Sequence, residues 1–492
     1  MATILTVKEQ PSEIVRYKIQ SQVKCFYWLG VILMDYRDKS LLLVIFGITG
    51  DLAQRKLLPA LYHLQQKGDL PPQTRIVGVS RRQTSVDQVF HPVQAALDGN
   101  HFDQRVFDQV KTLTEIVTMD LSSVEAYQSL RHRLRDISDE IGPGVSRLYY
   151  LSIPAEAFVS VVNQLGATGH NEPFATDIDQ PRLLVEKPFG HNTASAKELV
   201  MVTEKNFGEQ QTFRIDHYLA KETAQNILTF RFQNPLFQSI WNTRHIDAIT
   251  IAAHETIGIE GRVAFYEQTG ALRDILQSHL LQLLALVTME APAQLDSTSI
   301  HRAKLRLLDS IEPIGPEEVN TTAVRGQYDT YRDEVNNQHS HTETFARLKL
   351  RIDNEQWRNV AITLETGKAL SEKLTEVAVH FRPTGQASGS NVLLFRLQPK
   401  EGITLLLQAK QPGLQNDTDI VEMDFDYKRS FGSTSEAYER VIIDAIRGDQ
   451  SLFASSAEVL SSWRIVENVI TTWAQSTKDL QKYPVGTDAK NL

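Results

Sequence analysis

The first strongly hydrophobic segment of the chain is the run at residues 41–46, in which every residue is apolar. Uninterrupted apolar runs of this length are typical of strands buried on both faces of a parallel sheet. A helical pattern follows at 52–66, Pro71 and Pro72 end it, and residues 75–79 predict a second strand. This order predicts a βαβ unit at the beginning of an α/β domain.

Two later strands are predicted at 147–153 and 182–186, and the second is followed directly by Lys187 and Pro188. In an open parallel sheet, ligands bind at the carboxyl ends of the strands, so Lys187 is placed beside a ligand. Pro188 keeps Lys187 out of helical geometry and can form a cis peptide bond. The alternative is an ordinary strand terminator.

After Glu222 the pattern changes to successive strand-like runs without long helices between them. They lie at 244–253, 346–353, 360–366, 374–381, 392–398 and 403–409. Such an order predicts an antiparallel sheet in an α+β domain. The polar stretch at 311–342 is irregular and is interpreted as a surface excursion.

The predicted fold class is therefore an α/β Rossmann-type nucleotide-binding domain followed by an α+β domain with a large, mainly antiparallel sheet. We assign residues 41–213 to the first domain and 214–492 to the second, which also binds substrate and forms a dimer interface. Residues 1–40 fit neither domain and are expected to be an extension, disordered or not native. One hypothesis is that Met34 is the natural start.

Composition narrows the functional classes. A length of 492 residues with 41% hydrophobic and 23% charged residues fits a globular protein of two or three domains. The net charge of -9 argues against nucleic acid as a partner. The only cysteine, Cys25, fits a reducing compartment, and we expect a cytoplasmic protein. No apolar run reaches the roughly 18 residues that span a bilayer, so no membrane association is expected.

A glycine turn, Gly47-Ile48-Thr49-Gly50-Asp51, follows the first strand. Backbone amides and a helix N-terminus at this corner can hold a pyrophosphate, although any tight strand-to-helix turn also requires glycine. NAD-binding folds usually have an acidic residue after the second strand, whereas this chain has Ser80, Arg81 and Arg82. Two guanidinium groups there favour the 2′-phosphate of NADP; the alternative is a pair of solvated loop charges.

The most concentrated chemistry lies in the stretch Arg214–Glu222, which holds an acid, an imidazole, a phenol and an ammonium group within nine residues. If Asp216 opens a helix, His217 and Lys221 are four residues apart and project from one face. Two cationic or proton-bearing groups at one place predict an anion site.

Two other groups of residues are less specific on their own. Asp274 and His279 follow Gly270 in a predicted helix, but at about 100° per residue they do not share a face. His279 alone is more simply interpreted as a core histidine. Lys368 and Lys373 follow a strand end and alone would be interpreted as a solvated turn.

Taken together, these residues resemble the glucose-6-phosphate dehydrogenase family from about residue 41 to about residue 473. The block Arg214–Glu222 is close to diagnostic, and the order and spacing of all the blocks agree. The matching blocks are Gly47–Ala53, Val77–Arg81, Glu186–Gly190, Arg214–Glu222, Gly261–Arg262, Arg273–Gln282, Gly367–Leu370 and Tyr438–Arg440.

The resemblance implies oxidation of β-D-glucose 6-phosphate to 6-phosphoglucono-δ-lactone, with hydride transfer from C1 of the sugar to the nicotinamide. By position, His279 matches the general base of the family and Asp216 the carboxylate that orients it. Such a pairing is chemically sound, because a carboxylate fixes the imidazole tautomer and stabilises the cation formed during proton transfer. His217, Tyr218 and Lys221 match the phosphate site.

The remaining roles implied by the resemblance are as follows. Lys187 matches the residue that bridges substrate and nicotinamide. Glu255 and Asp274 match partners of the sugar hydroxyls, and Lys368 and Lys373 match further substrate contacts. The positions that match the NADP site are Gly47, Thr49, Gly50, Asp51, Lys56, Arg81, Asp120, Leu121 and Lys187. The expected cofactor is NADP, with NAD use left open, no metal is expected, and the expected assembly is a homodimer or homotetramer.

The chain departs from the family pattern at several positions. Ala220 replaces the usual glycine, which a helix would tolerate. Glu365 stands where arginine is usual, three residues before Lys368, and leaves substrate affinity open. The segment at 327–342 is shorter than usual, and basic residues for a second, structural NADP site are lacking, so that site is not predicted.

Two competing interpretations predict different residues. A catalytically silent NADP-binding regulatory homologue should lack His279, Asp216 or Lys187, and all three are present. A dehydrogenase for a non-phosphorylated sugar should lack the pair His217 and Lys221, which is present as well.

Overall fold

The computed structural model describes residues 36–97, 102–383, 389–432, 435–476 and 480–492. Met34, Cys25 and almost all of the predicted extension lie outside the described residues. The chain begins its described part with a short 3-10 helix, η1 (Tyr36–Asp38), directly before the first strand.

The first sheet has the strand order β15-β6-β5-β4-β1-β2-β3. Its strands are β1 (Ser40–Phe46), β2 (Thr74–Ser80), β3 (Thr114–Thr118), β4 (Val145–Leu151), β5 (Arg182–Val185), β6 (Thr212–Ile215) and β15 (Phe453–Ala454). All neighbours are parallel except β15, which pairs antiparallel with β6. Every residue of β1 is buried. The order 3-2-1-4-5-6 is that of a Rossmann-type domain, so the prediction for this domain is confirmed.

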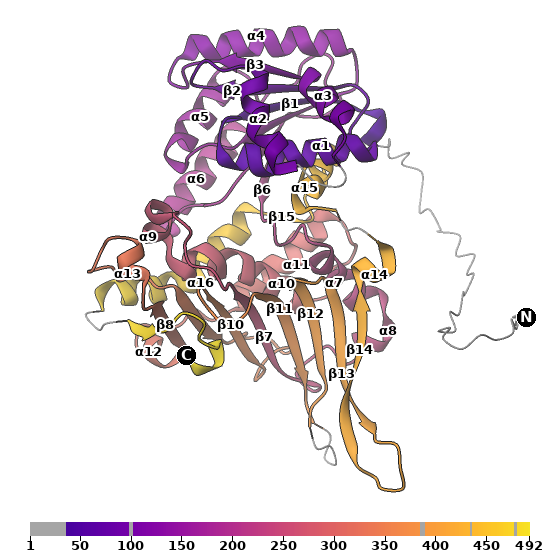
Figure 1. The fold of residues 1–492 in the computed structure, drawn as a ribbon, viewed down its shortest axis with the longest axis vertical. Coiled ribbons are helices and arrows are strands. Elements are labelled where there is room, and N and C mark those ends of the chain that lie inside the picture. Colours follow the sequence, from indigo (N-terminus) through magenta and orange to yellow (C-terminus); the bar gives the residue numbers. More distant parts are fainter. Residues whose placement is uncertain (1–35, 98–101, 384–388, 433–434, 477–479) are drawn as a thin grey trace, which may run out of the picture. The chain divides into compact units, whose positions relative to one another are not determined.

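Helices cover both faces of the first sheet (Figure 1). One face packs against α1 (Leu58–Lys67), α2 (Val86–Leu97), α3 (Gln104–Thr112) and α15 (Ala437–Arg447). The other packs against α4 (Val124–Ile141), α5 (Ala155–Ala167) and α6 (Thr193–Asn206). A short 3-10 helix, η3 (Glu209–Gln211), precedes β6.

The second sheet has the strand order β14-β13-β12-β11-β7-β10-β9-β8-β16. The strands are β7 (Ile246–His254), β8 (Ala323–Tyr328), β9 (Phe345–Leu350), β10 (Ala361–Gly367), β11 (Leu374–Phe381), β12 (Val392–Gln398), β13 (Gly402–Lys410), β14 (Thr418–Asp426) and β16 (Gln481–Tyr483). Only the pairs β7–β10 and β8–β16 are parallel. The sheet is therefore mainly antiparallel, as predicted.

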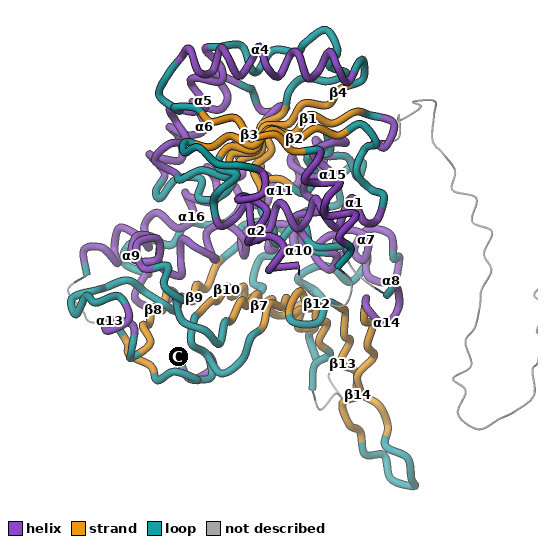
Figure 2. The backbone as a smooth tube through the Cα atoms, turned by 45° about the horizontal axis from the view of Figure 1, so that its top comes forward, coloured by secondary structure: helices purple, strands orange, loops and turns teal. Residues whose placement is uncertain are grey.

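A layer of helices packs on one face of the second sheet and forms the largest core of the described residues (Figure 2). These helices are α7 (Glu222–Gln233), the π-helix η4 (Leu272–Leu280), α10 (Leu281–Thr288), α11 (Ser297–Ser310) and α16 (Ser456–Gln475). Shorter elements are α8 (Pro235–Gln238), α9 (Val263–Ala271), α12 (Val319–Thr322), α13 (Tyr331–Glu334), α14 (Tyr427–Phe431) and η5 (Ala489–Asn491).

The interpretation of 311–342 as a surface excursion is wrong. This stretch contains β8, which lies between β9 and β16, and the side chains of Gln327, Tyr328 and Tyr331 are buried. The buried amide of Gln327 donates to the backbone oxygen of Thr342 at 2.8 Å. A polar strand is therefore stabilised in the interior by hydrogen bonds that a hydrophobicity pattern does not reveal.

The division of the chain into two domains at residue 213 stays a prediction. One feature of the structure bears on the composition of the first domain. Residues of α15 and β15, far along the sequence, return to the first sheet and pack in its core. Within the described part of the chain, no helix is long and apolar enough to cross a membrane.

Candidate functional site

The stretch from Asp216 to Lys221 is a series of turns between β6 and α7. The helix begins only at Glu222, so the expectation that Asp216 opens it is wrong. The carboxylate of Asp216 accepts the backbone amide of Tyr218 at 3.0 Å, and its carbonyl accepts that of Leu219 at 3.1 Å. An aspartate that binds the backbone two residues ahead favours a turn over a helix. Ala220 therefore lies in a turn.

Asp274 and His279 lie on η4, and its π-helical geometry changes their relation. Hydrogen bonds between residues five apart place such residues in succession along one face. The expectation that the two residues face apart assumed an ordinary α-helical period, which η4 does not have. Lys187 contacts both, donating to the carbonyl oxygen of Asp274 at 2.5 Å and approaching His279 Nε2 at 2.9 Å.

His279 is held at both ring nitrogens. Nδ1 lies 2.5 Å from Oδ1 of Asp216, and Nε2 faces the ammonium group of Lys187. Since the ammonium can only donate, Nε2 carries the lone pair and Nδ1 the proton that is donated to Asp216. The side chains of His279 and Asp216 are 1% and 2% exposed. This arrangement leaves Nε2 as the atom that can accept a proton.

The electrostatics of the cluster favour a neutral imidazole beside an ionised carboxylate. Burial lowers the pKa of His279; Asp216 opposes this shift, and Lys187 adds to it. For Asp216 burial favours the acid, but His279 and Lys187 outweigh it and hold the carboxyl pKa well below its usual value. Burial also lowers the pKa of Lys187, against the attraction of Asp274 and Asp216.

Aromatic rings surround the histidine. The ring of Tyr218 stacks on His279 with centroids 4.1 Å apart, and the ring of His217 meets it edge-on at 4.6 Å. Burial and the neighbouring His279 lower the pKa of His217 well below its usual value, so His217 is a neutral hydrogen-bonding group. The ammonium of Lys221 lies 3.9 Å from Glu401 and is the nearby cation of this predicted phosphate site.

The predicted sugar contacts meet at one end of the second sheet. Glu255 follows β7, and its backbone amide donates to Gly367 at the end of β10 at 2.9 Å. Lys368, 3% exposed, forms an ion pair with Glu255. Lys373 is exposed and directly precedes β11, whose first residue pairs with the last residue of β7.

Glu365 has its own partners on neighbouring strands. Its carboxylate accepts Nε of Arg347 at 2.6 Å and lies 3.0 Å from Nε2 of His254. Its charge is therefore compensated within the sheet.

Most of the predicted cofactor residues lie at the carboxyl ends of β1, β2 and β3, while Lys56 lies in the helix after β1 and Lys187 follows β5. Gly47 has φ of +80°, and a Cβ there would lie 2.1 Å from the carbonyl oxygen of Ser152, so only glycine fits. Gly50 closes the turn by donating to the carbonyl of Gly47 at 2.9 Å. Asp51 is exposed and pairs with Arg55 at 2.7 Å. The helix predicted at 52–66 is divided into the π-helix η2 (Ala53–Leu57) and α1.

The charged residues of this edge are exposed. Lys56, Arg81 and Arg82 face solvent, and neither arginine forms an ion pair with any described residue. The carboxylate of Asp120 accepts the amide of Ser122 at 2.9 Å, and the carbonyl of Leu121 accepts Tyr127 Oη at 3.3 Å. Gly47, Gly50 and the two arginines thus suit a phosphate-bearing nucleotide, by the closeness of the turn and by charge.

A partly buried carboxyl beside Lys187 was not assigned a role from the sequence. Glu186 accepts hydrogen bonds from Tyr150 and from Tyr438, and burial raises its pKa to about 7. The Glu-Lys pair at the end of the strand is the sequence feature that could have identified Glu186 as a site residue. No local pattern links it to Tyr438, which comes from α15.

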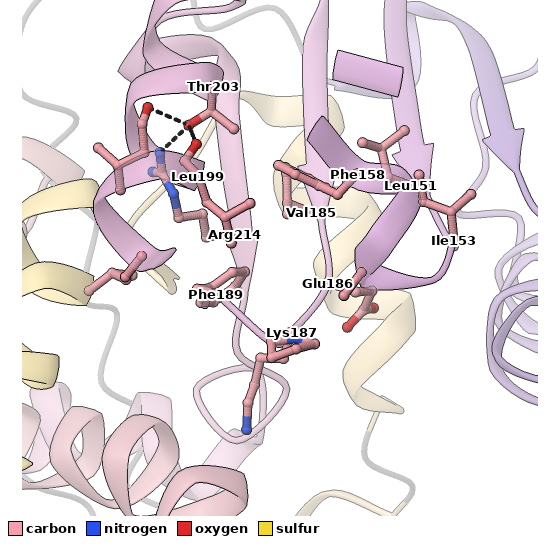
Figure 3. A pocket seen from close by; sticks show the side chains of 15 residues that line it. Leu151, Ile153, Phe158, Val185, Glu186, Lys187, Phe189, Leu199, Thr203 and Arg214 are labelled. Atoms are coloured by element: carbon pink, nitrogen blue, oxygen red, sulfur yellow. Dashed lines mark hydrogen bonds between the residues drawn. The ribbon is translucent and has the colours of Figure 1, made fainter. Parts of the chain in front are cut away.

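Behind this strand end lies an apolar cavity of about 40 Å³, lined by Val185, Phe158 and Leu199 among others. Figure 3 shows the ammonium group of Lys187 pointing away from these apolar side chains. The Lys187–Pro188 peptide bond is cis. Lys187 thus lines the cavity, while its ammonium group contacts Asp274 and His279. The described residues contain no group of three or more His, Cys, Asp and Glu side chains that could hold a metal ion.

Comparison with known proteins gives a consistent result along the chain. Residues 44–226 match the family model "Glucose-6-phosphate dehydrogenase, NAD binding domain", and residues 228–491 match "Glucose-6-phosphate dehydrogenase, C-terminal domain". The chain is 37% identical over 478 residues to glucose-6-phosphate 1-dehydrogenase of Chlamydia muridarum, which covers 90% of this chain and 92% of that one. The Rhizobium meliloti enzyme of the same name is 35% identical over 472 residues, with 90% and 93% covered.

Solved structures agree. A glucose-6-phosphate dehydrogenase in complex with glucose 6-phosphate is similar with a TM-score of 0.84 and 32% identity, covering 92% of this chain and 96% of that one. The Mycobacterium avium glucose-6-phosphate 1-dehydrogenase gives a TM-score of 0.79 and 32% identity, covering 92% and 95%. A levoglucosan dehydrogenase, at 9% identity and a TM-score of 0.52, covers 89% and 98% and shares the fold alone.

Proposed function

The chain belongs to the glucose-6-phosphate dehydrogenase family, and from that premise we propose that it oxidises β-D-glucose 6-phosphate to 6-phosphoglucono-1,5-lactone with reduction of NADP. The observation that carries this proposal is the position of His279, buried between Asp216 and Lys187. A neutral imidazole whose Nε2 is free of a proton, and whose other nitrogen is held by a carboxylate, is a general base. The silent regulatory alternative would have no need of this geometry.

In the proposed reaction His279 Nε2 accepts the proton of the C1 hydroxyl. The sugar hydroxyl takes the place that the ammonium of Lys187 has at Nε2 in the free protein. Asp216 then stabilises the imidazolium, as a buried carboxylate does for a histidine base. The bound nicotinamide dinucleotide supplies the acceptor for the C1 hydride. Lys187, released from Nε2, is positioned to hold the C1 oxygen.

We assign the phosphate group of the substrate to His217, Tyr218 and Lys221. Lys221 supplies the charge, and neutral His217 and Tyr218 supply hydrogen bonds. The Glu255–Lys368 pair and Asp274 are assigned to the sugar hydroxyls, with Lys373 at the rim. Carboxylate and ammonium groups gathered in this way suit a polyhydroxy substrate, because they can accept from and donate to its hydroxyls.

For the cofactor we propose NADP over NAD. The support is the pair of exposed guanidinium groups of Arg81 and Arg82, which have no carboxylate partner among the described residues. A 2′-phosphate can form charge-assisted hydrogen bonds with them, and the ribose of NAD cannot use them in the same way.

We also propose a homodimer or homotetramer. Apolar side chains of the hairpin β13–β14 and its turn are exposed: Leu414, Ile420 and Met423. β14 is an edge strand of the second sheet, and exposed apolar edges are usually covered. Light scattering should give at least twice the chain mass, and a monomer would contradict this assignment.

The low cysteine content supports a cytoplasmic location.

The activity is tested by following absorbance of the reduced cofactor with glucose 6-phosphate and NADP or NAD in turn. We expect turnover with glucose 6-phosphate and NADP, and a much higher KM with glucose than with its phosphate. Equal use of glucose would refute the phosphate assignment. Cofactor binding without turnover would support the silent homologue.

A further inference from the structure

Apart from the cluster of Asp216, His279 and Lys187, a second cavity lies where α9, η4, β8 and the end of α16 meet. This cavity is polar. Its volume is about 200 Å³, more than ten times the roughly 10–15 Å³ needed for one water molecule. Arg273, Arg325, His341 and Glu343 line it, together with Trp473. A cavity of this size and polarity is large enough for a small metabolite.

Two guanidinium groups in this cavity have no carboxylate within ion-pair distance among the described residues, although the carboxyl of Glu343 attracts both. Nε of Arg273 donates to the carbonyl of His191 at 3.1 Å, and Nη1 of Arg325 donates to that of Trp473 at 3.1 Å. Neither arginine forms an ion pair within the part of the chain that the structure describes. In contrast, Arg347 and Arg351 bind carboxylates. The remaining N–H groups of Arg273 and Arg325 are available to a ligand.

Glu343 contributes a buried carboxyl to the same cavity. It is 7% exposed, Oε1 accepts the backbone amide of Leu272 at 3.0 Å, and no side chain of the described residues donates to Oε2. Gly270 has φ of +65°, and a Cβ there would lie 2.4 Å from Oε1. The glycine therefore lets the carboxyl approach the backbone. Burial raises the pKa of Glu343, so this group can also take up a proton and donate.

We propose that this cavity binds the phosphate group of a small hydroxylated metabolite at a site separate from the substrate. Phosphate carries nearly two negative charges at neutral pH, which match the two guanidinium groups. Planar guanidinium groups bind phosphate oxygens through paired hydrogen bonds. Glu343 Oε2 provides the acceptor for a hydroxyl of the rest of the ligand.

The site is coupled to the catalytic helix through the backbone. Glu343 binds both Ala271 and Leu272 at the start of η4, with its carbonyl accepting the amide of Ala271 at 2.9 Å. Arg273 is adjacent to Asp274 and also holds His191, which follows the Lys187 loop. A ligand that engages Arg273 and Glu343 acts on the segment that positions His279. The inferred site is therefore regulatory.

The test uses inorganic phosphate as the probe in a Lys221→Gln background, which removes the proposed substrate-phosphate anchor. Thermal unfolding of the full chain is followed against phosphate concentration at constant ionic strength. We expect a saturable rise in Tm that persists in Lys221→Gln. Adding Arg325→Gln should weaken phosphate binding roughly tenfold or more, because charge-assisted hydrogen bonds are lost.

Matched variants separate the site from general charge effects. Arg306→Gln removes an exposed arginine on α11 and should leave phosphate binding unchanged. His341→Glu places a negative charge at the exposed rim without altering the core, and should weaken binding even if Arg325→Gln does not fold. The proposal is overturned if Lys221→Gln shows no phosphate effect, or if Arg325→Gln and His341→Glu bind phosphate as well as Arg306→Gln. The KM of Lys221→Gln for glucose 6-phosphate tests the proposed function separately.

Discussion

Around His279 the polar groups already have protein partners, whereas at the carboxyl end of β2 Arg81 and Arg82 are exposed and form no ion pair with the described residues. Asp216, His279 and Lys187 hold one another within 2.9 Å. Arg81 and Arg82 contact no carboxylate among the described residues. The contrast follows from the chemistry of each region. Proton transfer requires groups fixed before the substrate arrives, and nucleotide binding requires charges that the protein leaves available.

The largest expected effect comes from removing the base. His279→Asn should lower kcat by roughly 10² to 10⁴, with KM for glucose 6-phosphate within a few fold, because the amide cannot take the C1 proton. Steady-state kinetics of the purified variant measure both parameters. His132→Asn, at an exposed position on α4, is the matched control and should retain wild-type rates. Wild-type turnover of His279→Asn would remove this residue from the mechanism.

A second variant, Glu186→Gln, removes the free-energy cost of burying a charged carboxylate next to Lys187. Glu186 has its pKa raised by burial from 4.5 to about 7, a difference worth about 3 kcal/mol. A raised pKa in the folded state means that stability is fully present below pH 4.5 and is lost as pH rises through about 7. Glu186→Gln keeps an acceptor for Tyr150 and has no charge to bury.

Glu186→Gln should therefore gain stability relative to the wild type as pH rises from 4.5 to about 7, by up to about 3 kcal/mol. Urea unfolding at pH 5 and pH 8 measures the difference. Glu198→Gln, on the exposed face of α6, is the control and should show no such dependence. A Glu186→Gln variant that loses stability equally at both pH values would contradict the argument.

At the nucleotide edge the expected effect is smaller and specific to one cofactor. Arg81→Gln should raise KM for NADP roughly ten- to a hundredfold, since one or two charge-assisted hydrogen bonds are lost, with kcat preserved. KM for NAD should change little. Arg105→Gln, exposed on α3, controls for the loss of one positive charge. An equal loss for both cofactors would mean that Arg81 does not read the 2′-phosphate.

The difference between the regions also explains what the sequence could predict. The apolar run at 41–46 and the glycine turn after it have local signals, so the first sheet and its nucleotide edge were predictable, and Gly47 occupies the tight turn expected of it. The Asp216–His279 contact joins residues 63 apart. It could be inferred from the family resemblance, and no periodicity in the chain implies it.

The local geometry of the catalytic region was the least predictable part. An α-helical period separates Asp274 from His279, but both lie on the π-helix η4, whose period differs, and Lys187 contacts the carbonyl of Asp274 as well as His279. Asp216 ends a strand in a turn, although its spacing from Lys221 suggested a helix. Both departures from the expected geometry arose because tertiary contacts of a functional site outweigh local preference. The polar strand β8 was missed for the related reason that buried hydrogen bonds replace apolar side chains.

The smallest expected effect around His279 is a shift in the pH dependence of kcat/KM, measured as the pH below which kcat/KM decreases. Only neutral His279 accepts a proton, so kcat/KM decreases as pH drops through its pKa, which burial places below the usual 6.5. Lys187 lowers this pKa and Asp216 raises it. Both variants are measured through the activity that remains in them. Lys187→Met should shift the decrease of kcat/KM at low pH, the acid limb, to higher pH, and Asp216→Asn should shift it to lower pH. Lys205→Met, exposed on α6, should not move it. Shifts of the same sign in both variants would show that the limb reports a group other than His279.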